Sequence, residues 1–164
     1  MDLDLSSGKA DPQPQQTSIA SVLRQRIAER LKPQPITVTI PEVEGMTVTY
    51  DPTGLTVESL GSYRERAGID PRSDEQPSAA KATSMMAMIL ADRCIGFAID
   101  GKDYLDDSGE RVTFSSPVIH EMLGTNTWTD AVIALYGSSG DVISTGGLLL
   151  ERAGLGDRVK TVNP

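Results

Sequence analysis

The stretch AAKATSMMAMILADRCIGFAI, residues 79–99, decides the fold that we expect for this chain. Its apolar residues recur at helical spacing, and only Lys81, Asp92 and Arg93 carry charge. The expected apolar face consists of Ala82, Met85, Met86, Ile89, Leu90, Cys94, Ile95 and Phe97. With Ser78 as its N-cap, the pattern predicts a core helix that runs to about Phe97.

Two alternating segments before this helix predict a β-hairpin. In residues 36–40 and 46–50, apolar side chains alternate with threonines, which is the period of a half-buried strand. Pro41 would end the first strand, and Gly45 supplies the backbone freedom that the turn requires. Two further short strands, residues 98–99 and 111–114, are expected to pair across an acidic loop.

Capping residues and apolar spacing predict the remaining helices. The first runs from Val57 to about Ala67, with Leu60 and Tyr63 facing inward. The expected N-caps are Thr56, Ser116, Thr127 and Asp141, and the expected ends are Gly68, Gly124, Gly137 and about Ala153. Gly146 and Gly147 weaken the last helix.

Length and composition predict one domain with tails. A chain of 164 residues can form one substantial core, and only 4% of its residues are aromatic. We expect a disordered arm over residues 1–17, an amphipathic helix over 18–32, a single globular domain over 34–153 and a tail over 154–164. The predicted fold is α+β, with a small β-hairpin sheet packed with a mostly helical core and flexible N- and C-terminal tails.

Two apolar surfaces are candidates for partner binding, and each has an alternative role. Ser18 can cap a helix whose apolar stripe either packs on the domain or docks another protein. A methionine cluster in residues 79–99 either fills the core or forms an adaptable binding surface. The stripe consists of Ile19, Val22, Leu23, Ile27 and Leu31, and the cluster of Met85, Met86 and Met88.

Charge and cysteine content restrict the class of partner. The formal net charge of -8 argues against nucleic acid, because binding a polyanion requires clustered Lys and Arg. A single cysteine, Cys94, allows no intrachain disulfide and is consistent with a reducing cytoplasm. We find neither a secretory signal nor a membrane-spanning stretch.

No motif predicts catalysis or metal binding. The acidic residues between Asp100 and Glu110 are the best candidate for a cation loop, but the calcium-loop template counted from Asp103 places Ser108 where glycine is required and Phe114 where glutamate is required. His120 is the only histidine, and the glycine-rich segments lack a phosphate-binding lysine. We therefore expect no catalytic, cofactor or metal residues, and the alternative is a metal-dependent hydrolase that uses the acidic loop.

The segment VTIPEVEGMTVTYDPTGLTVESLGSYRERAG, followed by the helix of residues 79–99, resembles the tail assembly chaperones of long-tailed bacteriophages. In that family a hairpin of the type V-x-I-P … G-x-x-V-x-Y-x-P precedes a helix and then an Ala- and Met-rich helix. The resemblance covers roughly 60 residues. The matching hairpin positions are Val38, Ile40, Pro41, Gly45, Val48, Tyr50 and Pro52.

The resemblance implies a non-enzymatic protein of the host cytoplasm that coats the tape measure protein and recruits tail tube subunits. Such a role requires exposed apolar surface, reversible self-association and a soluble, acidic exterior. No nucleic acid, membrane or cofactor takes part in it. The alternative function is a structural component of the phage particle, such as a neck or tail-completion protein.

Overall fold

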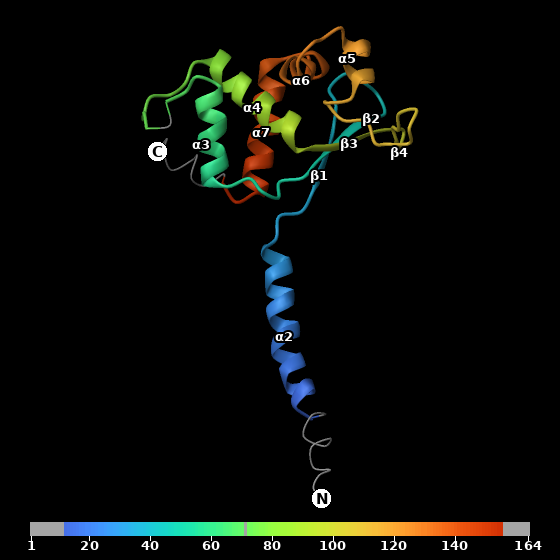
Figure 1. Cartoon of the computed structure of the whole chain (residues 1–164). Coiled ribbons are helices and arrows are strands. Elements are labelled where there is room, and N and C mark those ends of the chain that lie inside the picture. The colour runs from blue at the N-terminus through green and yellow to red at the C-terminus, as the bar shows by residue number, and fades with distance from the viewer. Residues whose placement is uncertain (1–11, 71, 156–164) are drawn as a thin grey trace, which may run out of the picture. The chain divides into compact units, whose positions relative to one another are not determined.

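The computed structural model describes residues 12–70 and 72–155 (Figure 1). The chain divides into two compact units, residues 1–32 and 33–164. The described residues contain six helices and a four-stranded antiparallel sheet, so the predicted α+β class is confirmed. Residues 1–11 and 156–164, which hold most of the predicted arm and tail, lie outside the described residues.

The first unit contains helix α2 (Pro12–Leu31). The prediction that this helix begins at its cap Ser18 was wrong, because its first residue, Pro12, lies six residues before Ser18. Pro12 and Pro14 are compatible with that start, since the first helical residues have no intrahelical partner for their backbone N–H groups. The segment 12–17, predicted to belong to a disordered arm, is therefore helical.

The predicted hairpin is present in the second unit and forms half of the sheet. Strands β1 (Ile36–Thr39), β2 (Met46–Tyr50), β3 (Cys94–Ile99) and β4 (Lys102–Asp103) are ordered β1-β2-β3-β4. Val48 of β2 lies opposite Val38 of β1 and Phe97 of β3, so these three side chains share one face. Gly45 has φ +80, as the turn between β1 and β2 requires.

The central helix is shorter than predicted. Helix α4 (Ala79–Arg93) begins after the N-cap Ser78 and passes directly into β3 at Cys94. The extension to Phe97 was wrong because residues 94–99 pair with β2, where Phe97 is fully buried. Helical spacing in an apolar run does not separate a helix from a buried strand that follows it.

The strand predicted at residues 111–114 was also wrong. β3 instead pairs with β4 through the Asp100-Gly101 turn, and Arg111 forms only an isolated bridge with Leu105. The backbone N–H of Phe97 still donates to the carbonyl of Val112, at 3.2 Å. Residues 111–114 therefore lie beside β3 without forming a regular ladder.

Five helices complete the second unit, and most of their predicted caps are correct. They are α3 (Val57–Arg66), α4, α5 (Pro117–Leu123), α6 (Trp128–Tyr136) and α7 (Ser139–Arg152). The side chains of Thr56, Ser78 and Thr127 each accept a hydrogen bond from the first turn of their helix. The cap of α7 is Ser138, not Asp141, because the Ser138 side chain accepts from the backbone N–H of Asp141.

The C-terminal tail was predicted to begin at residue 154, which was wrong, because residues 154 and 155 form the cap of α7. Gly154 has φ +86, and the backbone N–H of Leu155 donates to the carbonyl of Leu150 at 2.8 Å. This arrangement is a Schellman cap, in which the residue after the left-handed glycine packs back on the helix. Leu155 is accordingly buried and belongs to the core.

The core lies between one face of the sheet and the helices. Helix α4 packs against α6 and α7, and α3 packs against α4 (Figure 1). On the inner face of the sheet, Val48, Tyr50 and Phe97 are fully buried, and Phe97 meets Phe114 edge to face. On the other face, Thr37 and Thr49 hydrogen-bond through their hydroxyl oxygens at 2.8 Å.

Candidate functional site

The methionine cluster lies in or against the core. Met85 is 7% exposed, and Met86 and Met88 are partly buried against the same core. A Cβ atom built on Gly146 of α7 would lie 2.6 Å from Sδ of Met86, so the two helices meet closely at this point. This placement favours core filling over an open methionine surface.

The apolar stripe of α2, in contrast, is exposed. Ile19, Leu23 and Ile27 follow one another at intervals of four residues and form a single row along the helix. Leu31, the last residue of α2, ends that row in the sequence. The exposed fractions are 66% for Ile19, 41% for Val22, 55% for Leu23 and 51% for Ile27.

The acidic loop has its own internal bonding. The Asp106 carboxylate oxygen Oδ1 accepts from the backbone N–H groups of Ser108 and Glu110, at 2.9 and 3.0 Å. These bonds, that of Glu110 first, hold the pKa of Asp106 below its ordinary value. Among the described residues, no group of three or more His, Cys, Asp and Glu side chains is arranged to hold a metal ion.

Two other reactive side chains are engaged in the fold. Burial raises the pKa of the Cys94 thiol to about 11, which keeps it protonated and poorly nucleophilic at neutral pH. Nδ1 of His120 lies 3.1 Å from the hydroxyl oxygen of Thr125, beyond the end of α5.

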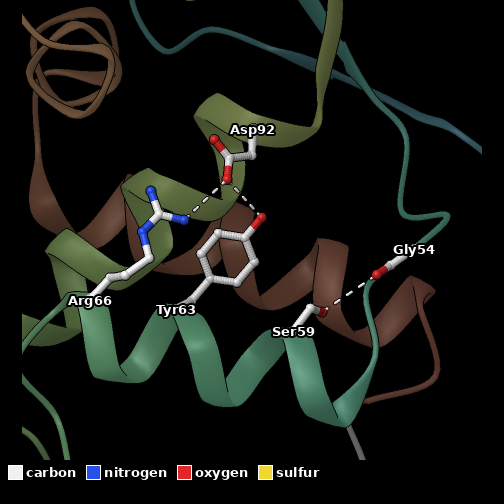
Figure 2. Close-up of polar contacts among 5 residues, drawn as sticks. All are labelled: Gly54, Ser59, Tyr63, Arg66 and Asp92. Carbon is white, nitrogen blue, oxygen red and sulfur yellow. Dashed lines mark hydrogen bonds and ion pairs between the residues drawn. The ribbon is translucent and has the colours of Figure 1, made fainter.

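A polar cluster joins α3 to α4. The Tyr63 hydroxyl donates to Oδ2 of Asp92 at 2.9 Å, and Nη1 of Arg66 lies 3.5 Å from the same oxygen (Figure 2). The Arg66 guanidinium also stands over the Tyr63 ring, 5.4 Å from its centroid. Tyr63, Arg66 and Asp92 each have a partner inside the cluster, so the cluster links the two helices.

The structure adds one surface that sequence reasoning missed. An open hollow of about 520 Å³ lies where the β1–β2 turn meets the β3–β4 turn. These turns are joined because the backbone N–H of Asp100 donates to the carbonyl of Gly45, at 2.8 Å. The apolar lining includes Ile40, Val43 and Met46, and the acidic lining includes Glu42, Glu44 and Asp100. We call this surface the acidic hollow.

The backbone at the acidic hollow is unusual in two places. Glu42 (φ +62) and Asp100 (φ +51) are the non-glycine residues with positive φ in the described part of the chain. Asp100 precedes Gly101 in a hairpin turn that favours Asp-Gly. Glu42 instead follows Pro41 in a turn closed by the Val43 N–H and the Ile40 carbonyl, at 3.2 Å, where glycine is the usual residue.

Charge is segregated between the two units. Residues 12–32 carry four basic side chains against Glu29, a net charge of +3. Residues 33–155 carry eight basic and eighteen acidic side chains, a net charge of -10. The basic residues of this segment are Arg24, Arg26 and Arg30 in α2 and Lys32 directly after it. The exposed stripe of α2 therefore lies on a basic helix, and the acidic hollow lies on an acidic unit.

Comparisons with known proteins returned no relatives: no family model, curated protein or solved structure matches this chain. No helix in the described ranges is long and apolar enough to cross a membrane.

Proposed function

We propose that this protein is a non-enzymatic assembly chaperone that binds a helical client through the exposed stripe of α2. The observation that carries the proposal is the exposure of Ile19, Leu23 and Ile27 in one row. Such a row is the apolar face that a helix presents to a partner helix or groove. Four large apolar side chains exposed together on one helix favour a role in binding.

The family resemblance makes the tape measure protein of a long-tailed phage the proposed client and the tail tube protein a second partner. A tape measure protein is long and helical, so an amphipathic helix is a suitable surface to cover it during assembly. In this proposal the chaperone acts in the host cytoplasm before tail tube subunits polymerise around the client.

Co-expression with a tape measure protein tests this proposal. The variant Leu23→Glu/Ile27→Glu places two charges on the row, and we expect at least about tenfold less client to co-purify, because burying an unpaired carboxylate costs more than 1.4 kcal/mol. Ser21→Glu/Gln25→Glu is the matched control. It adds the same charge at the same spacing to the opposite side of α2, and it should retain the client.

Two results would contradict the proposal. The first is that the full chain recovers no tape measure protein. The second is that the row variant and its control bind the client equally well. Stoichiometric recovery of this protein from purified virions, by mass spectrometry, would instead support the neck or tail-completion function.

A further inference from the structure

We propose that α2 of one copy of this protein docks in the acidic hollow of a second copy. The apolar row of α2 would lie on the floor of the hollow, and Arg26 would face its acidic rim. The row is the one that the proposed function gives to the client, so the two contacts exclude each other on a single helix. The proposal stands on the described residues of this chain and does not depend on the identity of the client.

The two surfaces match in apolar character. Ile40 and Met46 are buried beneath the acidic hollow, while Val43 is 41% exposed at its surface. A volume of about 520 Å³ is within the range of sites that bury small apolar groups, and it has room for a few side chains of the α2 row. Contact would remove from water the exposed surface of Leu23 and Ile27 on one partner and mainly that of Val43 on the other.

The two surfaces also match in charge. Arg26 follows Val22 by four residues and so lies beside the apolar row. Across the interface it would meet Glu42, Glu44 or Asp100, which line the acidic hollow. Direct pairing of two α2 helices would instead bring Arg26 and its basic neighbours close to the same charges on the partner, and like charges oppose such contact.

The backbone of Glu42 supports a binding role for the acidic hollow. Glycine would adopt φ +62 without strain, whereas glutamate pays a conformational cost there. Strained residues of this kind cluster at binding and catalytic sites. The exposed Glu42 side chain has the charge that a basic helix requires.

The linker favours docking on a second copy. Residues 32–35 separate α2 from β1, and Pro33, Pro35 and the residues that precede them favour extended backbone. An extended linker of four residues disfavours a sharp reversal of the chain. Because the contact joins two different surfaces, repetition of it would build rings or open chains of copies.

Disulfide trapping with the full-length protein tests the geometry. The variants Ile27→Cys and Glu44→Cys are purified separately, mixed and oxidised, and the cross-linked peptides are identified by mass spectrometry. The native Cys94 is buried and does not compete. We expect the mixed disulfide between positions 27 and 44 to exceed both homodimer disulfides.

Three results of the trapping experiment would overturn the proposal. A predominant disulfide between two copies of position 27 would mean that α2 pairs with itself. Absence of any cross-link would mean that the copies do not associate in this way. In a doubly substituted chain, an exclusively intrachain disulfide would mean that the hollow takes the helix of its own chain.

Sedimentation equilibrium tests the electrostatic part. We expect Glu42→Gly/Glu44→Gln to weaken self-association at least about tenfold. The matched control Glu58→Gln/Glu65→Gln removes the same charge from exposed positions of α3 and should change it little. Raising the salt from about 50 mM to about 500 mM should also weaken association of the wild type. Self-association that responds to neither the hollow variant nor salt would overturn the proposal.

Discussion

At the residue scale, the Tyr50 and Tyr136 hydroxyls form the polar contact that joins the sheet to α6. Their oxygen atoms lie 2.7 Å apart, and both side chains are buried. Each hydroxyl is the hydrogen-bonding partner that the structure gives to the other. Removing either hydroxyl therefore leaves the other one buried without this bond.

This mutual contact predicts that the costs of two similar substitutions are not additive. Tyr136→Phe leaves the Tyr50 hydroxyl buried without that bond, and we expect a loss of about 1–3 kcal/mol in the free energy of unfolding. Tyr50→Phe leaves the Tyr136 hydroxyl buried without the same bond, so its cost should be similar. The double variant should cost less than the sum of the two, because no hydroxyl is then left unpaired. Urea denaturation of the three variants measures these costs, and strictly additive costs would contradict the contact.

At the element scale, the crossing of α4 and α7 depends on one of two adjacent glycines. Gly146 is buried against Met86, while a Cβ atom on Gly147 would meet no other atom within 4 Å. Gly147 therefore only weakens α7, as expected from the low helical propensity of glycine. Gly146 also allows α4 and α7 to pack closely. Met86 occupies the space that a side chain at position 146 would fill.

Alanine substitutions at these two positions should have opposite effects. Gly147→Ala should stabilise the protein by about 0.5–1 kcal/mol, because alanine loses less backbone entropy in a helix. Gly146→Ala should destabilise it by about 1–3 kcal/mol, because Met86 must shift in a packed core. Thermal or urea unfolding followed by circular dichroism measures both, and a stabilising Gly146→Ala would show that α4 and α7 do not meet as described.

At the scale of the whole molecule, burial of neutral acids predicts how stability depends on pH. Burial raises the pKa of Cys94 from 9.0 to about 11 and those of Tyr63 and Tyr136 from 10.0 to about 12. Burial also raises the pKa of Tyr50 well above its ordinary value. The contribution of these groups to the free energy of unfolding is complete below pH 9. It is lost as the pH rises towards 12, because the groups ionise at lower pH in the unfolded chain than in the folded one.

We therefore expect the free energy of unfolding to fall between pH 9 and pH 12. Urea titrations at several pH values measure how steeply the free energy of unfolding falls with pH. Tyr50→Phe should make this fall less steep, because one buried ionisable group is removed. Between pH 6 and pH 8 these groups are protonated in both states and contribute no slope. A stability that stays constant up to pH 12 would contradict the buried positions of these side chains.

Local patterns in the sequence determined the elements whose signals are short-range. Alternation defined β1 and β2, and Thr56, Ser78 and Thr127 marked helix starts, because a capping side chain bonds within its own first turn. The apolar row Ile19, Leu23 and Ile27 was likewise readable from helical spacing.

Tertiary structure alone decided the features that depend on distant partners. Cys94 to Ile99 became a strand because β2 pairs with it, and Met86 became a packing residue because Gly146 lies against it. The acidic hollow combines residues 42–46 with Asp100, which are far apart in sequence. No periodicity predicts such a surface, because it forms only when the ends of two hairpins are brought together by sheet pairing.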